Sequence, residues 1–250
     1  MRSRLRHDTL VIIPARNEAG RIGDVLRGLA KQGVQADVLV IDDGSDDNTA
    51  GEAERFGAQV IRHPFNLGYG ATLQTGYIYA RKRNYNQVVQ MDGDGQHDPA
   101  CVHTLLDNLS DGVDLVLGSR FLNPNPPPVT LARRLGSRLF AWIVTKWTGT
   151  RITDPTSGFQ ALSRRVLREV VQDNFPEDFP DADVLITLYR AGLKLKEVPV
   201  RMHERKGGVS MHRGSMAAYY AYKMFLTLAL LAVRRVSPFR PVHQISTRTS

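Results

Sequence analysis

Short apolar runs alternate with segments of helical periodicity through the first 120 residues, and this alternation restricts the fold more than any other feature. Residues 22–29, 70–83 and 99–109 carry apolar side chains at helical spacing. Strands that alternate with helices pair as a parallel sheet with helices on its faces, so the sequence predicts an α/β fold. The buried strands are predicted at Leu10–Pro14, Asp37–Asp42, Ala58–Arg62, Gln87–Asp92 and Asp114–Ser119.

The second half of the chain has a less regular pattern. Asn123–Pro128 is too rich in proline to be a helix and is predicted to be a surface loop. Helices are predicted over Leu131–Trp147 and Asp181–Ala191, and a strand over Leu195–Val200. With 250 residues, no internal repeat and no clear linker, the chain fits one large domain better than two small ones.

Charge is unevenly distributed along the sequence. The net charge is +8, and residues 201–250 hold nine Lys or Arg against one acid, so the first 200 residues are balanced. A basic C-terminal segment suits nucleic acid, an anionic membrane or a phosphorylated substrate. The single cysteine, Cys101, excludes an internal disulfide and fits a reducing compartment. The N-terminus has no apolar stretch of signal-peptide length, and we expect a cytoplasmic protein.

The segment Met216–Val236 is mostly apolar but is interrupted by Lys223. Its uninterrupted part, Met224–Val233, is about half of the roughly 20 residues that a membrane span needs. A core helix and a helix at a membrane surface remain open, and a true span is the least favoured of the three.

Polar motifs follow the predicted strands, at the sheet edge where α/β proteins bind ligands. Asp92 and Asp94, separated by Gly93, can hold a hard divalent cation together with a diphosphate. An acidic turn is the simpler alternative. An EF-hand is a poor fit, because His97 stands where that loop needs glycine.

Each of three further segments can be interpreted either as a binding site or as a structural feature. Asp42–Ser45 (DDGS) offers acids to a ribose or a base, or forms a turn that caps a helix. Asn66–Gly70 (NLGYG) offers backbone N–H groups to a phosphate, or is a turn at a helix start. Arg201–Arg213 offers arginines and glycines to phosphates, or is a solvated run of charge.

The order of these motifs resembles the inverting nucleotide-sugar glycosyltransferases with the GT-A fold, over residues 8–213. Within that family it is most similar to the dolichyl-phosphate mannose synthase and polyprenyl-phosphate glycosyltransferase branch. The resemblance implies a Rossmann-like, mostly parallel sheet flanked by helices, in a domain of residues 1–213. A C-terminal amphipathic helix and tail, residues 214–250, would contact a membrane surface or a second subunit. Six segments carry the resemblance: PARNE (Pro14–Glu18), DDGSDDNT (Asp42–Thr49), NLGYGATLQTG (Asn66–Gly76), DGDGQHDP (Asp92–Pro99), TSGFQA (Thr156–Ala161) and EVPVRMHERKGGVS (Glu197–Ser210).

On the donor side, the resemblance implies a nucleoside diphosphate sugar with Mg²⁺ or Mn²⁺. Asp92 and Asp94 match the pair that binds the metal and the diphosphate, and Gln96 matches a further metal contact. The positions that match the nucleoside site are Pro14, Ala15, Glu18 and Asp43.

On the acceptor side, Asp183 matches an acid near the acceptor. Arg205, Gly208 and Ser210 match a loop near the donor and lipid phosphates. That loop usually continues with lysine, whereas Met211 follows here, and His212 and Arg213 are the two candidates to supply the missing charge. The catalytic set implied by the resemblance is Asp94, Asp183 and Arg205.

The resemblance implies a hexosyltransferase that moves mannose or glucose to a polyprenyl or dolichyl phosphate at the cytoplasmic membrane face. GDP-mannose and UDP-glucose stay open as donors, and so does a homodimer. A same-fold enzyme with a soluble hydroxyl acceptor is the main alternative, with Asp183 as its general base. A pyrophosphorylase would need a basic glycine-rich loop where PARNE stands. A non-catalytic nucleotide-binding or nucleic-acid-binding module is the alternative of another class, and no nucleic-acid motif supports it.

Overall fold

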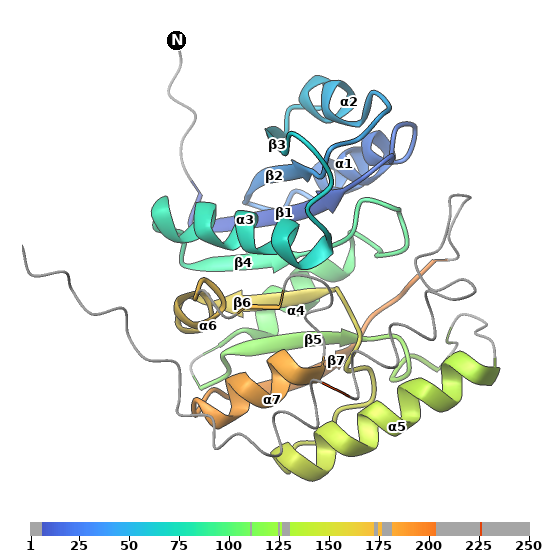
Figure 1. The fold of residues 1–250 in the computed structure, drawn as a ribbon, viewed down its shortest axis with the longest axis vertical. Coiled ribbons are helices and arrows are strands. Elements are labelled where there is room, and N and C mark those ends of the chain that lie inside the picture. Colours follow the sequence, from blue (N-terminus) through green and yellow to red (C-terminus); the bar gives the residue numbers. More distant parts are fainter. Residues whose placement is uncertain are drawn as a thin grey trace, which may run out of the picture.

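The computed structural model describes residues 7–110, 112–124, 126, 131–172, 175–176, 182–203 and 226. Within these residues seven strands form one sheet with the order β3-β2-β1-β4-β6-β5-β7. Figure 1 shows the sheet running through the molecule with helices packed against it. The strands are β1 (Thr9–Ala15), β2 (Asp37–Asp42), β3 (Gln59–Arg62), β4 (Gln87–Gln90), β5 (Leu115–Ser119), β6 (Gln160–Ser163) and β7 (Leu195–Pro199).

The sheet is mostly parallel, as predicted, but one inner strand is antiparallel. β1 pairs in parallel with β2 and β4, and β5 pairs in parallel with β7. β6 lies between β4 and β5 and is antiparallel to both. The sequence analysis identified Thr156–Ala161 as a motif and did not predict this strand. A four-residue strand with polar residues at both ends is too short to show a period of two.

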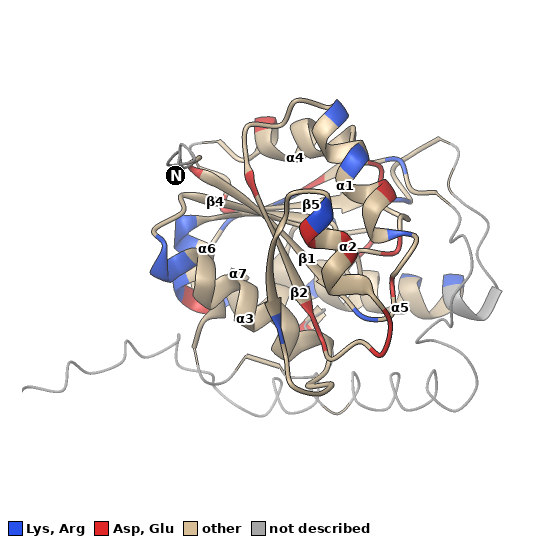
Figure 2. Ribbon diagram, turned by 90° about the horizontal axis from the view of Figure 1, so that it is seen from above, with Lys and Arg blue, Asp and Glu red and all other residues tan. Residues whose placement is uncertain are grey.

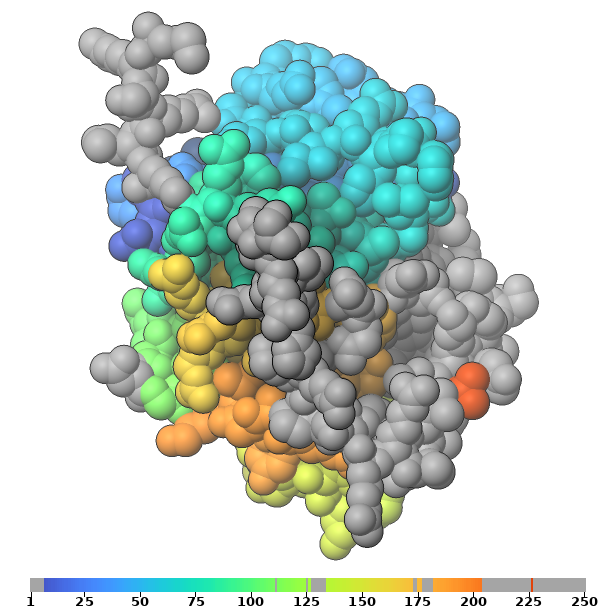
Figure 3. Space-filling view, turned by 60° about the vertical axis from the view of Figure 1, so that its left-hand side comes forward, coloured from blue at the N-terminus to red at the C-terminus, as the bar shows by residue number. Residues whose placement is uncertain are grey.

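The helices cover the two faces of the sheet in two groups, as Figures 1 and 2 show. One face packs against α1 (Ile22–Lys31), α2 (Thr49–Arg55) and α4 (Cys101–Asn108). The other packs against α3 (Tyr69–Lys82), α5 (Leu131–Thr148), α6 (Arg164–Val170) and α7 (Ala182–Arg190). On that second face α3, α6 and α7 lie side by side (Figures 1 and 3). The helix α6 was not predicted.

Alternation along β1 explains the two-sided core. Leu10 and Ile12 point into the cluster beneath α3, whereas Val11 and Ile13 point into the cluster beneath α1 and α4. All four are fully buried, which is why the strand reads as a continuous apolar run. Gly76 lets α3 approach closely, because a Cβ there would lie 3.1 Å from Ile41 Cδ1.

The predicted boundaries agree with the structure to within two residues. β4 ends at Gln90, two residues before the predicted Asp92, because the backbone N–H of Asp92 donates to the ring of His97 rather than continuing the ladder. The predicted C-terminal region, residues 214–250, lies outside the described residues except Leu226. In the part of the chain that the structure describes, no helix has the length and apolar character to cross a membrane.

Candidate active site

The candidate site lies where the chain reverses direction across the sheet. β1 leads through α1 to β2 on one side, whereas α3 carries the chain back to β4 on the other side of β1. Such a switch point leaves a crevice beyond the carboxyl ends of the strands. The carboxyl ends of β1, β2 and β4 carry Pro14–Glu18, Asp42–Ser45 and Asp92–Gln96 respectively.

The first two of these segments are hydrogen-bonded to each other. The N–H of Asp43 donates to the carbonyl oxygen of Ala15 at 2.9 Å. The N–H of Asn17 donates to Ser45 Oγ at 3.0 Å, and the N–H of Glu18 donates to Thr49 Oγ1 at 2.9 Å. The structure thus brings the predicted nucleoside residues Pro14, Ala15, Glu18 and Asp43 to one edge. The Glu18 carboxylate is also paired with Arg21.

Asp43 is buried and organises the glycine loop that follows β3. Its carboxylate accepts the N–H of Leu67 at 2.8 Å and the N–H of Gly68 at 3.0 Å, and it lies 2.9 Å from His63 Nδ1. Gly68 has φ +99°, a conformation that favours glycine. A carboxylate has about four acceptor sites, so Asp43 uses most of them to hold this loop. Asn66–Gly70 is therefore a turn fixed by Asp43 at the start of α3.

His97 holds the backbone of Asp92. Its Nδ1 accepts the N–H of Asp92 at 3.0 Å, which leaves the ring proton on Nε2, 3.8 Å from Asp92 Oδ2. The ring stacks on Phe159 with centroids 4.7 Å apart. Burial lowers the pKa of His97 to about 4, so the imidazole is neutral near pH 7. Sequence reasoning used His97 only as an argument against an EF-hand, and no local pattern signals this role.

Asp92 and Asp94 lie partly exposed on the loop after β4. Asp94 Oδ1 accepts the N–H of Gln96 at 2.9 Å. Gly93 packs against the end of β1, since a Cβ there would lie 3.3 Å from Ala15 Cβ and 3.4 Å from the Pro14 carbonyl oxygen. The predicted metal pair and the predicted nucleoside edge are therefore adjacent.

The donor set fits a hard divalent cation completed by substrate. Within the described residues no group of three or more His, Cys, Asp and Glu side chains could hold a metal by itself. Mg²⁺ and its like are commonly held by only one or two carboxylates together with substrate phosphates. Asp92 and Asp94 meet that pattern, since both are carboxylate oxygen donors and both are partly exposed.

Residues 201–203 lie against the same loop. The N–H of His203 donates to the Gln96 carbonyl oxygen at 2.7 Å, and Met202 forms an isolated bridge with His97. Arg201 lies 3.6 Å from the Asp98 carboxylate. The predicted phosphate loop therefore starts next to the Asp92–Gln96 segment. Its own predicted residues, Arg205, Gly208, Ser210 and Arg213, lie outside the described residues.

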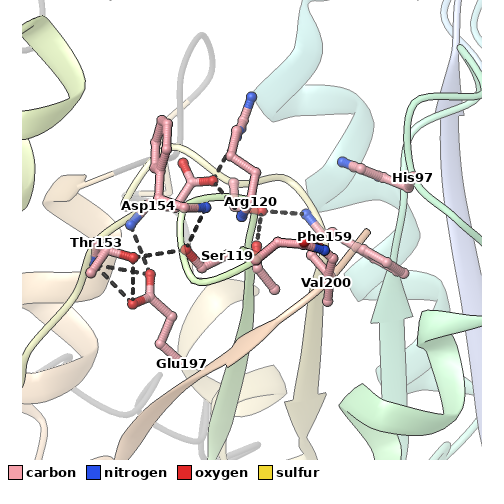
Figure 4. A network of polar contacts seen from close by, with 12 residues as sticks. His97, Ser119, Arg120, Thr153, Asp154, Phe159, Glu197 and Val200 are labelled. Atoms are coloured by element: carbon pink, nitrogen blue, oxygen red, sulfur yellow. Dashed lines mark hydrogen bonds and ion pairs between the residues drawn. The ribbon is translucent and has the colours of Figure 1, made fainter. Parts of the chain in front are cut away.

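A buried polar network borders this loop and was not foreseen. Arg120 Nε donates to Asp154 Oδ2 at 2.6 Å, and Asp154 Oδ1 is buried and has no hydrogen-bond partner among the residues that the structure describes. Glu197 on β7 accepts the N–H groups of Thr153 and Asp154 at 2.9 and 2.7 Å. Figure 4 shows these side chains converging, with His97 nearby. The network fixes the segment before β6 to Arg120, just after β5, and to the middle of β7.

Asp183 lies in the first turn of α7 and is buried. A carboxylate in that place is stabilised by the helix dipole. Its backbone oxygen accepts Thr187 Oγ1 at 2.8 Å, as in an ordinary helix turn. The role that the resemblance implies for Asp183 stays a prediction.

Comparison with known proteins adds to this geometry. A family model described as glycosyl transferase family 2 matches residues 10–171. The chain is 33% identical over 199 residues to an uncharacterised protein of Methanocaldococcus jannaschii, covering 78% of this chain and 82% of that protein. It is 31% identical over 217 residues to the polyprenol monophosphomannose synthase of Mycolicibacterium smegmatis, covering 83% and 82%.

A solved structure shares the fold. It is the glucosyl-3-phosphoglycerate synthase of Mycobacterium tuberculosis in complex with Mn²⁺ and UDP-glucose. The TM-score is 0.67 at 22% identity, over 90% of this chain and 78% of that one.

Proposed function

Because the chain belongs to glycosyl transferase family 2, we propose that it transfers a hexose from a nucleoside diphosphate sugar to a polyprenyl phosphate. It is a nucleotide-sugar glycosyltransferase with the GT-A fold. The main observation that supports this proposal is that the Pro14–Glu18, Asp42–Ser45 and Asp92–Gln96 segments lie against one another at the switch point of the sheet. There Ala15, Asp43 and Gly93 bring the predicted nucleoside and diphosphate segments into direct contact.

The nucleoside would lie against the Pro14–Glu18 and Asp42–Ser45 segments. Their mutual hydrogen bonds hold this edge in place before a ligand arrives, so little order has to be gained on binding. The diphosphate would extend from there toward Asp92 and Asp94, with Gly93 packed between the two segments. GDP-mannose and UDP-glucose both consist of a nucleoside followed by a diphosphate and a hexose, so both are compatible with this arrangement.

Asp92 and Asp94 would hold Mg²⁺ or Mn²⁺, with Gln96 next to them on the same loop. When bound, such an ion neutralises charge on the leaving diphosphate. The part played by this chain is to place the two carboxylates. His97 holds the Asp92 backbone, and the Gln96 N–H holds Asp94 Oδ1.

A lipid phosphate is the acceptor that the relatives favour, since one of them is named a polyprenol monophosphomannose synthase. A phosphate monoester has a second pKa of about 6, so its oxygen is anionic near pH 7 and needs no strong general base. Asp183 would then orient the acceptor or the sugar. Arg205, Gly208, Ser210 and Arg213 would bind phosphate in the loop that starts after His203.

A surface of α5 supports peripheral contact with an anionic membrane. Leu135, Leu139 and Trp142 are exposed along one stripe of this helix, and Trp142 is 64% exposed. The helix Leu131–Thr148 has no acidic residue, and Arg138 and Lys146 are exposed on it. An apolar stripe flanked only by basic side chains is typical of helices that bind anionic lipid surfaces.

The proposal is tested by a transfer assay with polyprenyl phosphate, Mn²⁺ or Mg²⁺, and labelled GDP-mannose and UDP-glucose in parallel. We expect label in the organic phase with one donor, and a loss of at least about 100-fold in Asp94→Ala. Asp107→Ala, at an exposed aspartate in the last turn of α4, is the matched control and should keep full activity.

Metal-dependent nucleotide binding without any lipid product would contradict the lipid acceptor. A soluble hydroxyl acceptor would then lead, with Asp183→Ala as the variant that should abolish transfer. Full activity in Asp94→Ala would contradict the assignment of the metal pair.

A further inference from the structure

Tyr69, the first residue of α3, contacts the loop after β4. Its hydroxyl donates to Asp92 Oδ1 at 2.9 Å. Asp43 fixes the N–H of Gly68 immediately before it, so the backbone that carries Tyr69 is itself held. The NLGYG segment is thus connected to the predicted metal pair through one side chain.

A buried chain of hydrogen bonds fixes the Tyr69 hydroxyl from behind. Gln90 Nε2 donates to the Tyr69 oxygen at 3.2 Å, and Gln90 Oε1 accepts the hydroxyl of Tyr77. Gln90 and Tyr77 are each 3% exposed. Burial raises the pKa of Tyr77, so its hydroxyl stays protonated and can only serve Gln90 as donor. Every hydrogen bond in the series points toward Asp92.

Gly158 makes room for this contact. A Cβ at this position would lie 2.8 Å from the Tyr69 oxygen and 3.3 Å from Asp92 Oδ2. An alanine would therefore push the hydroxyl away from the carboxylate. Gly158 belongs to the TSGFQA segment, whose next residue, Phe159, stacks on the His97 ring that holds the Asp92 backbone.

We propose that Tyr69 is a positioning residue that holds Asp92 in the orientation for the metal and diphosphate. This inference rests on the proposed function, because it assigns Tyr69 a role toward the same carboxylate. A carboxylate fixed at Oδ1 keeps its other oxygen aimed in one direction, which lowers the cost of ordering it when a cation binds. Partners that orient metal ligands typically affect metal affinity by about 10- to 100-fold.

The test compares Tyr69→Phe with Tyr79→Phe. Both tyrosines lie on α3, and both donate their hydroxyl to a side chain, but Tyr79 bonds Gln59 rather than Asp92. Free Mn²⁺ is measured by electron paramagnetic resonance during titration of each full-length protein in the presence of GDP or UDP. We expect the apparent Kd for Mn²⁺ to rise about 10- to 100-fold in Tyr69→Phe and to stay within about twofold in Tyr79→Phe.

Gly158→Ala provides a second variant that leaves Tyr69 chemically intact. It should weaken Mn²⁺ binding in the same direction, and it keeps the test valid if Tyr69→Phe fails to fold. Wild-type affinity in a folded Tyr69→Phe or in Gly158→Ala overturns the inference while the proposed function stands. A wild-type protein that binds no Mn²⁺ with either nucleotide overturns the metal assignment itself, and the inference with it.

Discussion

At the scale of single residues, Asp43 shows how one carboxylate can serve the fold and the site together. It was predicted to contact the nucleoside, and it holds the backbone of Leu67 and Gly68 as well as the ring of His63. The loop it fixes leads directly to Tyr69. A change at Asp43 should therefore alter stability as well as ligand binding.

Asp43→Asn should lower the free energy of unfolding by about 2 to 3 kcal/mol, because an amide has only one oxygen for the two N–H groups and loses the charge. Urea denaturation measures this effect. Asp46→Asn, an exposed neighbour in the same segment, should stay within about 0.5 kcal/mol of wild type. Unchanged stability with lost nucleotide binding would mean that Asp43 serves the ligand alone.

At the scale of elements, α5 combines a core face with an exposed face of different character. Phe140 and Val144 pack into the core beneath the sheet, whereas Leu135, Leu139 and Trp142 are exposed. Exposed leucine and tryptophan along one helix are costly in water unless they meet an apolar surface.

Trp142→Ala should weaken co-sedimentation with phosphatidylglycerol vesicles by about tenfold or more, because a large apolar side chain no longer enters the interface. Phe65→Ala is the control, since Phe65 is also 64% exposed but lies on the loop after β3. Added salt should weaken binding of the wild type, and phosphatidylcholine vesicles should bind poorly. Equal binding by Trp142→Ala and wild type would remove α5 from the membrane contact.

At the scale of the whole molecule, the Glu197 network joins the outer strands to the segment that carries Gly158. Burial raises the pKa of the Glu197 carboxyl above its ordinary value of 4.5. The folded protein therefore binds this proton more tightly than the unfolded chain does. The resulting stabilisation is fully present below about pH 4.5 and is lost as the pH rises through the pKa of the folded state.

Glu197→Gln cannot titrate, so the difference in unfolding free energy between wild type and this variant should narrow as the pH rises from about 4 to 7. Urea denaturation across that range measures it. Glu54→Gln, at an exposed position on α2, should leave the pH dependence of wild type unchanged. A difference that widened with pH would show that the carboxylate form is the one the Thr153 and Asp154 N–H groups favour.

The local sequence pattern was sufficient to predict those helices and strands in which apolar side chains repeat with a clear period. The range Asp37–Asp42 was predicted as a strand and is β2, and the apolar spacing from Ile22 to Leu29 is the buried face of α1. The polar motifs were correctly placed at the carboxyl ends of strands, because the order of parallel strands and helices brings those ends to one edge. The family, too, follows from residues that stand in order along the chain.

Tertiary structure alone decided how those motifs meet. The antiparallel β6, the His97 ring under Asp92, and the Tyr69–Asp92 hydrogen bond have no signature in local sequence. The bond from Asp43 to Gly68 spans 25 residues and that from Tyr69 to Asp92 spans 23. Periodicity reports which face a residue takes within its own element, whereas hydrogen bonds of this range depend on the order in which strands pair. The sequence therefore determined the elements and the chemistry of the site, and the packing of the sheet decided which side chain holds which carboxylate.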